Sequence, residues 1–150
     1  MRIHELTEDE CRAILQRTSL GRLACARGNQ PYIVPISLYF DSDGSSLYSF
    51  STAGQKIDWM RENPKVCVEV EDISDKKHWT TVLVFGRYDE IDHSKEDANA
   101  RRRAFDLFQR NSEWWLPGAG KTTSEAQQPA VVYRIQIERM TGRRAARPTT

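Results

Sequence analysis

One short stretch of the sequence carries the side chains best suited to binding an anion. The segment STAGQK, residues 51–56, places two hydroxyls, a glycine and a lysine close together. The glycine lets backbone N–H groups converge, and the helix predicted to follow has a positive dipole end that attracts anions. Together with Lys56, this arrangement suits a phosphate monoester. An ordinary strand-to-helix turn with a surface lysine has the same pattern, so the residues alone leave both interpretations open.

The other motifs in the chain give no catalytic set. The segment GAGKTT, residues 118–123, resembles part of a phosphate-binding P-loop, but Trp115 stands where a P-loop needs its first glycine. No GxSxG pattern or other pair of nucleophile and base is visible, so an enzyme with this sequence would depend on a bound cofactor. The histidines are scattered and the cysteines form no CxxC pair, so neither a metal site nor a disulfide framework is expected.

Length and charge narrow the class of protein. The 150 residues are enough for one domain, residues 1–150, and the net charge of +1 gives no general attraction for nucleic acid. No apolar run approaches the roughly 18 residues that a membrane helix needs, and the N-terminus has no apolar signal-peptide core. We therefore expect a cytoplasmic protein that contacts no membrane. Arg143, Arg144 and Arg147 suggest that residues 141–150 form a flexible basic tail.

The elements that must position the 51–56 stretch are mostly strands. Helices are expected over 8–17, over 56–62 and from Ser94 onward. Alternating apolar residues and turn signals predict strands over 21–26, 31–40, 45–51, 65–72, 79–91 and 130–140. Pro35 indicates an edge, a bulge or an opening in its strand, and Gly86 indicates a bend or bulge. Many short strands with few helices predict a mainly β fold, an antiparallel barrel of about six strands with flanking helices.

The order of three segments resembles the flavin-binding split-barrel family. The segments are YIVPISLYF, LYSFSTAGQKIDWMRENPKVCVEVE and WTTVLVFGRYDEI. The most specific part is the turn of small residues, followed by Gly-x-Lys and a helix that ends at Asn-Pro. The family includes pyridoxamine 5′-phosphate oxidase and nitroimidazole-reductase-like proteins, and this sequence is more similar to the second group. The resemblance implies a homodimeric split β-barrel with FMN bound between the subunits.

The resemblance also implies which residues bind the cofactor. Val34, Pro35, Ile36 and Ser37 would lie along the isoalloxazine ring; Phe50, Ser51 and Thr52 would line the ribityl and phosphate path; Gln55 and Lys56 would hold the phosphate; Trp79, Thr80 and Thr81 would come from a second subunit. Many family members have an arginine in place of Gln55, so one positive charge is missing here. Trp114 and Trp115 would either cover the flavin or anchor their own loop.

The expected function is that of an FMN-dependent oxidoreductase. It would take reducing equivalents from a nicotinamide donor and pass them to a small acceptor, such as a nitroaromatic compound or a quinone. The C-terminal segment GRRAARPTT does not match the substrate-binding run of the oxidase, which argues against pyridoxamine phosphate as the substrate. Two alternatives stay open: the same fold with a deazaflavin or haem, and a flavin-binding or nucleic-acid-binding module without turnover.

Overall fold

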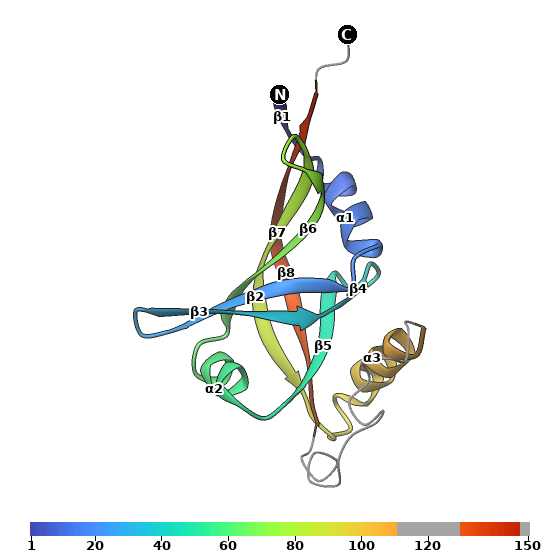
Figure 1. Ribbon diagram of the computed structural model, residues 1–150. Helices are drawn as coiled ribbons and strands as arrows, with labels where there is room; N and C mark the ends of the chain where they lie inside the picture. The colour runs from blue at the N-terminus through green and yellow to red at the C-terminus, as the bar shows by residue number, and fades with distance from the viewer. Residues whose placement is uncertain (111–129, 148–150) are drawn as a thin grey trace, which may run out of the picture.

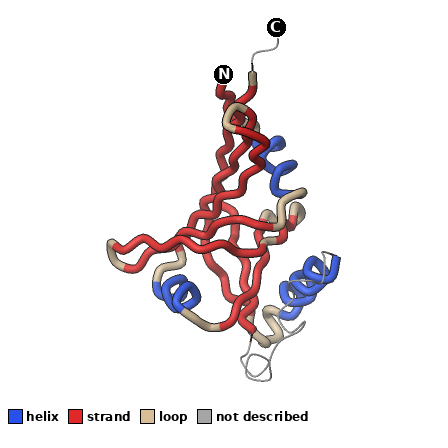
Figure 2. Tube along the Cα trace, in the orientation of Figure 1, coloured by secondary structure: helices blue, strands red, loops and turns tan. Residues whose placement is uncertain are grey.

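The described part of the chain forms one antiparallel sheet and three helices. The computed structural model describes residues 1–110 and 130–147. In chain order the elements are β1 (Arg2–Glu5), α1 (Glu8–Gln16), β2 (Leu20–Arg27), β3 (Gln30–Ser37), β4 (Tyr39–Asp41), β5 (Ser46–Thr52), α2 (Gln55–Glu62), β6 (Lys65–Asp75), β7 (His78–Ile91), α3 (Ala98–Arg110) and β8 (Ala130–Ala146). The predicted mainly β, antiparallel architecture is confirmed, with eight strands instead of about six (Figure 1; Figure 2).

The sheet has the strand order β3-β2-β6-β7-β8-β5-β4, and β1 pairs with the end of β8. Figure 1 shows β6, β7 and β8 as a long arm that ends beside both termini, while the β2–β3 hairpin crosses it lower down. The register of β7 against β8 shifts between Phe85 and Gly86, which confirms the predicted bulge. A Cβ on Gly86 would lie 2.4 Å from the carbonyl oxygen of Gln136, so a larger residue requires the backbone to move. Pro35 lies on β3, an edge strand, where a missing N–H is tolerated.

Two groups of buried side chains hold the sheet and the helices together. The larger group joins α1 and α2 to the sheet, and the alternation predicted for β6 is confirmed because its three valines belong to it. The smaller group packs α3 against β4 and β5, where the rings of Phe108 and Tyr39 have centroids 5.0 Å apart. Arg103 of α3 also contacts the buried carboxylate of Asp41 on β4, at 2.9 Å. The helix α3 is therefore attached to the sheet by apolar contacts and by a charge pair.

Local signals explain where the helices begin. The Glu10 N–H donates to the Thr7 hydroxyl and the Thr7 N–H donates to the Glu10 carboxylate, which confirms the capping box of α1. The sequence predicts that the last helix starts at Ser94, but α3 starts at Ala98. The Ser94 hydroxyl instead accepts a hydrogen bond from the Asp97 N–H at 3.3 Å, within the turn that precedes the helix.

The C-terminal segment differs from the prediction. The sequence predicts a flexible basic tail over 141–150, but β8 continues to Ala146 because β7 and β1 both pair with it. Arg144 faces α1, where it forms an ion pair with Glu10 at 3.3 Å. The sequence also gave no indication of β1, which is too short to show a clear alternation. No helix among the described residues is both long and apolar enough to cross a membrane.

Candidate functional site

The β5–α2 corner, residues 51–56, has the features of an anion-binding site. β5 ends at Thr52 and α2 begins at Gln55, so the N–H groups of the first helical turn face outward here. No described side chain caps them. The preceding Gly54 has an extended backbone (φ 177°) that any residue can adopt. Glycine therefore matters here for the space that its missing side chain leaves. No described heavy atom lies within 4 Å of the place that a Cβ would occupy.

Lys56 adds a partly buried positive charge to this corner. Burial lowers the pKa of its ammonium group, and the only opposing effect comes from the Cys25 thiol, so no described carboxylate is close enough to act as a counter-ion. A partly desolvated cation without a counter-ion favours the binding of an anion. Gln55 beside it is exposed and uncharged. The corner therefore offers one full positive charge, the helix N-terminus and room for a phosphate.

One hydrogen bond shows which backbone groups of β3 point to its free edge. The Leu38 N–H donates to the Ser19 carbonyl at 3.0 Å, so the adjacent pair Leu20–Ser37 is of the non-hydrogen-bonded type. In such a pair the N–H and C=O groups point away from the partner strand. The N–H and C=O of Ser37 therefore point away from β2, toward the edge that no described strand occupies.

The remaining residues predicted along the isoalloxazine ring follow from the same alternation. The backbone groups of Val34 and Ile36 point into the ladder with β2, and their side chains face the core. Pro35 faces the free edge with its carbonyl but has no N–H to donate. Ser37 is thus the one residue of the four whose N–H points to the free edge of β3.

β5 lies beside the free edge of β3, and the space between the two strands is called the opening below. The Ser51 hydroxyl donates to the carbonyl of Thr52 at 2.8 Å, and both residues are half-exposed next to the corner. Phe50 points to the opposite face of the strand, where its ring centroid lies 4.8 Å from that of Phe108 on α3. Of the three residues predicted to line the ribityl and phosphate path, Ser51 and Thr52 therefore lie at the end of β5, next to the corner. Phe50 belongs to the contact with α3.

The remaining predicted residues lie at the opposite end of the molecule. Trp79 and Thr81 are on the first part of β7, where Trp79 pairs with Ala145 near the C-terminal end of β8. Figure 1 shows that this end of the arm lies beside the chain termini, away from α2. Thr80 is buried on the other face, where its hydroxyl accepts a hydrogen bond from Arg144 at 3.3 Å. Its side chain is therefore directed toward α1, and only its backbone is left for a cofactor. One chain alone does not bring these residues to Lys56.

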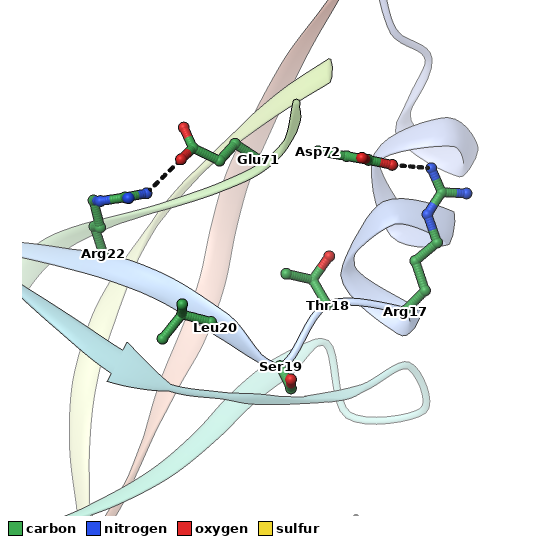
Figure 3. A pocket seen from close by; sticks show the side chains of 7 residues that line it. All are labelled: Arg17, Thr18, Ser19, Leu20, Arg22, Glu71 and Asp72. Carbon is green, nitrogen blue, oxygen red and sulfur yellow. Dashed lines mark hydrogen bonds and ion pairs between the residues drawn. The ribbon is translucent and has the colours of Figure 1, made fainter. Parts of the chain in front are cut away.

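The hollow drawn in Figure 3 lies apart from the predicted site. It has a volume of about 470 Å³ and lies between the end of α1, the start of β2 and β6. Its arginines are already paired, Arg22 with Glu71 at 2.8 Å and Arg17 with Asp72 at 3.3 Å. These pairs leave no net charge to select an anion, and no predicted site residue lines the hollow. The described residues also contain no cluster of three His, Cys, Asp or Glu side chains placed to bind a metal.

Sequence reasoning missed the residues that fix α2 in place. The side-chain amide of Asn63 donates to the Ala26 carbonyl at 3.1 Å, which explains the Asn-Pro ending noted in the sequence. Arg61 forms an ion pair with Glu90 at 2.8 Å, and Glu90 also accepts a hydrogen bond from the Tyr88 hydroxyl at 2.6 Å. The Arg61–Glu90 pair joins segments that are distant in the sequence, so no local sequence pattern predicts it. Both hold the helix that carries Lys56 against the sheet.

Known proteins resemble this chain along nearly its whole length. A family model described as pyridoxamine 5′-phosphate oxidase matches residues 7–144. The uncharacterized protein RA0666 of Rhizobium meliloti is 36% identical over 148 residues, which make up 97% of either chain. A crystal structure from Mesorhizobium loti, described as a FAD-binding protein, is 36% identical with a TM-score of 0.80, over 97% of this chain and 100% of its own.

A more distant structure shares the fold. It comes from Bacteroides thetaiotaomicron and is provisionally described as a 5-nitroimidazole antibiotic resistance protein. It is 16% identical with a TM-score of 0.67, over 95% of this chain and 89% of its own. The resemblance noted in the sequence is confirmed, and the chain belongs to the pyridoxamine 5′-phosphate oxidase family of split-barrel proteins.

Proposed function

We propose that this protein binds a flavin across the free edge of β3 and the β5–α2 corner, and that it acts as an oxidoreductase. The observation that carries the proposal is Lys56, a partly buried cation beside an uncapped helix start and an open space. The edge of β3 lies on the other side of the opening, where the Ser37 N–H and the Pro35 carbonyl could pair with the polar edge of an isoalloxazine ring. Family membership supports the same ligand.

FMN is the flavin that we propose. The corner offers a single full charge and one helix N-terminus, which suits a phosphate monoester. The description of the Mesorhizobium loti relative favours FAD as the second candidate. Releasing the ligand from the natively purified protein by denaturation, followed by a visible spectrum and a mass measurement, separates FMN, FAD, a deazaflavin and haem in one experiment.

A homodimer would complete the site. Four of the large apolar side chains that are exposed lie on the same face of the β3-β2-β6-β7 sheet as Trp79 and Thr81; they are Leu20, Ile33, Ile73 and Leu83. An exposed apolar face of this kind is typical of a protein interface. A second copy packed on it could carry its Trp79 and Thr81 to the corner of the first. We expect Leu83→Arg to give monomers in analytical ultracentrifugation, whereas Phe105→Arg, on α3, leaves the dimer intact.

The side chains of this protein would bind and orient the flavin. The flavin itself supplies hydride and single-electron transfer when it is bound. We propose a nicotinamide nucleotide as the donor and a nitroaromatic compound or a quinone as the acceptor. Protein that is colourless as purified, and whose melting temperature is unchanged by excess FMN or FAD, would refute the proposal. A ligand at a hundred times its Kd should stabilise the fold by about 2.7 kcal/mol.

A further inference from the structure

One side-chain hydrogen bond connects the two strands that border the proposed flavin site. β3 and β5 are not paired in the sheet, which places β2, β6, β7 and β8 between them. The Ser49 hydroxyl on β5 nevertheless donates to the Ser37 carbonyl on β3, at 2.5 Å. Ser49 is 2% exposed, so this bond is shielded from water. It sets how far β3 stands from β5 at the point where the barrel is split.

The residue that accepts this bond is also the one whose N–H points to the free edge. Both backbone groups of Ser37 point to the free edge, as the alternation along β3 requires. Ser49 occupies the carbonyl and leaves the N–H of the same residue open. The Ser37 carbonyl belongs to the planar peptide that it shares with the Leu38 N–H, which donates to Ser19, so this peptide is held at both of its polar groups. The Ser37 N–H belongs to the preceding peptide, and the two peptides meet at the Cα of Ser37. By holding the peptide that follows the Cα of Ser37, Ser49 restrains the residue that carries the one donor directed to this edge by residues 34–37.

We propose that Ser49 is a positioning residue for the flavin, acting through the backbone of Ser37 without touching the ligand. The inference rests on the proposed flavin site, and it adds that the Ser49 hydroxyl is needed for normal binding of the ring. Removing the Ser49 hydroxyl should disturb recognition of the ring, and leave recognition of the phosphate at Lys56 unchanged. The loss should therefore be equal for FMN and for riboflavin, which lacks the phosphate.

Two serine-to-alanine variants on the same strand test this. Ser49→Ala removes the bond to β3, while Ser46→Ala removes an equally buried hydroxyl whose bond, 3.1 Å to the Gly44 carbonyl, stays within its own turn. We expect Ser49→Ala to bind both FMN and riboflavin about three- to tenfold more weakly, the range for one hydrogen bond. Its visible flavin band and midpoint potential should shift. Ser46→Ala should match the wild type in all these measurements, and Ser49→Thr, which keeps the hydroxyl, should restore the wild-type band.

Three outcomes would overturn the inference. Ser49→Ala could behave like Ser46→Ala, or it could lose affinity for FMN alone, which would assign the effect to the phosphate. Should Ser49→Ala fail to fold, amide NMR of the wild-type protein decides: riboflavin should shift the Ser37 amide more than those of Val34 and Ile36, and the reverse order contradicts the inference. Wild-type protein that takes up no flavin at all refutes the proposed function itself, a result distinct from these three.

Discussion

Replacing Lys56 with methionine should separate binding of the phosphate from binding of the ring. Methionine keeps much of the length and apolar surface of the lysine side chain and removes its charge. A hydrogen bond that involves a charged group contributes about 1.5–3 kcal/mol, so FMN should bind about ten- to a hundredfold more weakly. The exposed Gln55 cannot replace the lost charge. Riboflavin, which has no phosphate, should bind the variant as it binds the wild type.

The effect of the same change on the unliganded protein has the opposite sign. Burial holds the pKa of Lys56 below its usual value of 10.5, which means that the folded state disfavours the ammonium form. The unfolded chain therefore binds more protons between the folded pKa and 10.5, and stability should rise with pH across that window. Lys56→Met should lack this rise, and it should be at least as stable as the wild type at neutral pH.

The assay is a titration of the apoprotein with each ligand, followed by quenching of flavin fluorescence at low and high salt. Lys65→Met is the matched control, because Lys65 is an exposed lysine at the start of β6. Equal FMN affinity in Lys56→Met and the wild type would show that the corner is not the phosphate site. A parallel loss of riboflavin affinity would show that the substitution damages the fold at the corner instead.

Four further substitutions test other parts of the argument. Gln55→Arg should tighten FMN binding about tenfold without changing riboflavin binding, because it restores a charge that many family members carry; equal gains for both ligands would contradict this. Asp41→Asn should lower the free energy of unfolding by about 1.5–3 kcal/mol. Hydrogen bonding from Arg103 holds the pKa of Asp41 below 3.8 in the folded protein. The stability from this pair is therefore fully present above pH 3.8 and is lost as the pH falls through the lower pKa of the folded state. The stability of the variant should depend less on pH in this range. Gly86→Ala should lower the free energy of unfolding, measured with denaturant, by about 1–3 kcal/mol, because its Cβ would clash with the backbone of β8. Gly54→Ala places its Cβ in open space, so its free energy of unfolding should stay within about 0.5 kcal/mol of the wild type.

Features with a local physical cause could be predicted from the sequence. The capping box at Thr7 requires only a hydroxyl and a carboxylate three residues apart, and it forms as predicted. The bulge at Gly86 and the edge position of Pro35 likewise follow from what a glycine or proline backbone permits. The turn into α2 was recognised from its small residues and from the charge of Lys56. In each case the signal lies within a few neighbouring residues.

The parts that were missed depend on partners that are distant in the sequence. The segment TGRRAA has the composition of a solvated tail, and it becomes a strand because β7 is long enough to pair with it. Its two arginines then have different environments: Arg144 faces Glu10 on α1, while Arg143 faces the opposite side, opposite Thr81. The composition of the segment cannot distinguish these two arginines. Only the pairing register decides which face of the strand each side chain takes.

The serines of β5 show the same limit at the candidate site itself. Ser49 and Ser51 lie on the same face of one strand, and nothing in the sequence SLYSFST distinguishes their roles. Ser51 donates to the carbonyl of its own neighbour, a bond that any strand-end serine can form. Ser49 donates to a strand that approaches it only after β2, β6, β7 and β8 have been placed between them in the sheet. The effect that we propose for Ser49 thus depends on how the sheet brings β3 beside β5. The β5–α2 corner, in contrast, could be singled out from the sequence because its residues are consecutive.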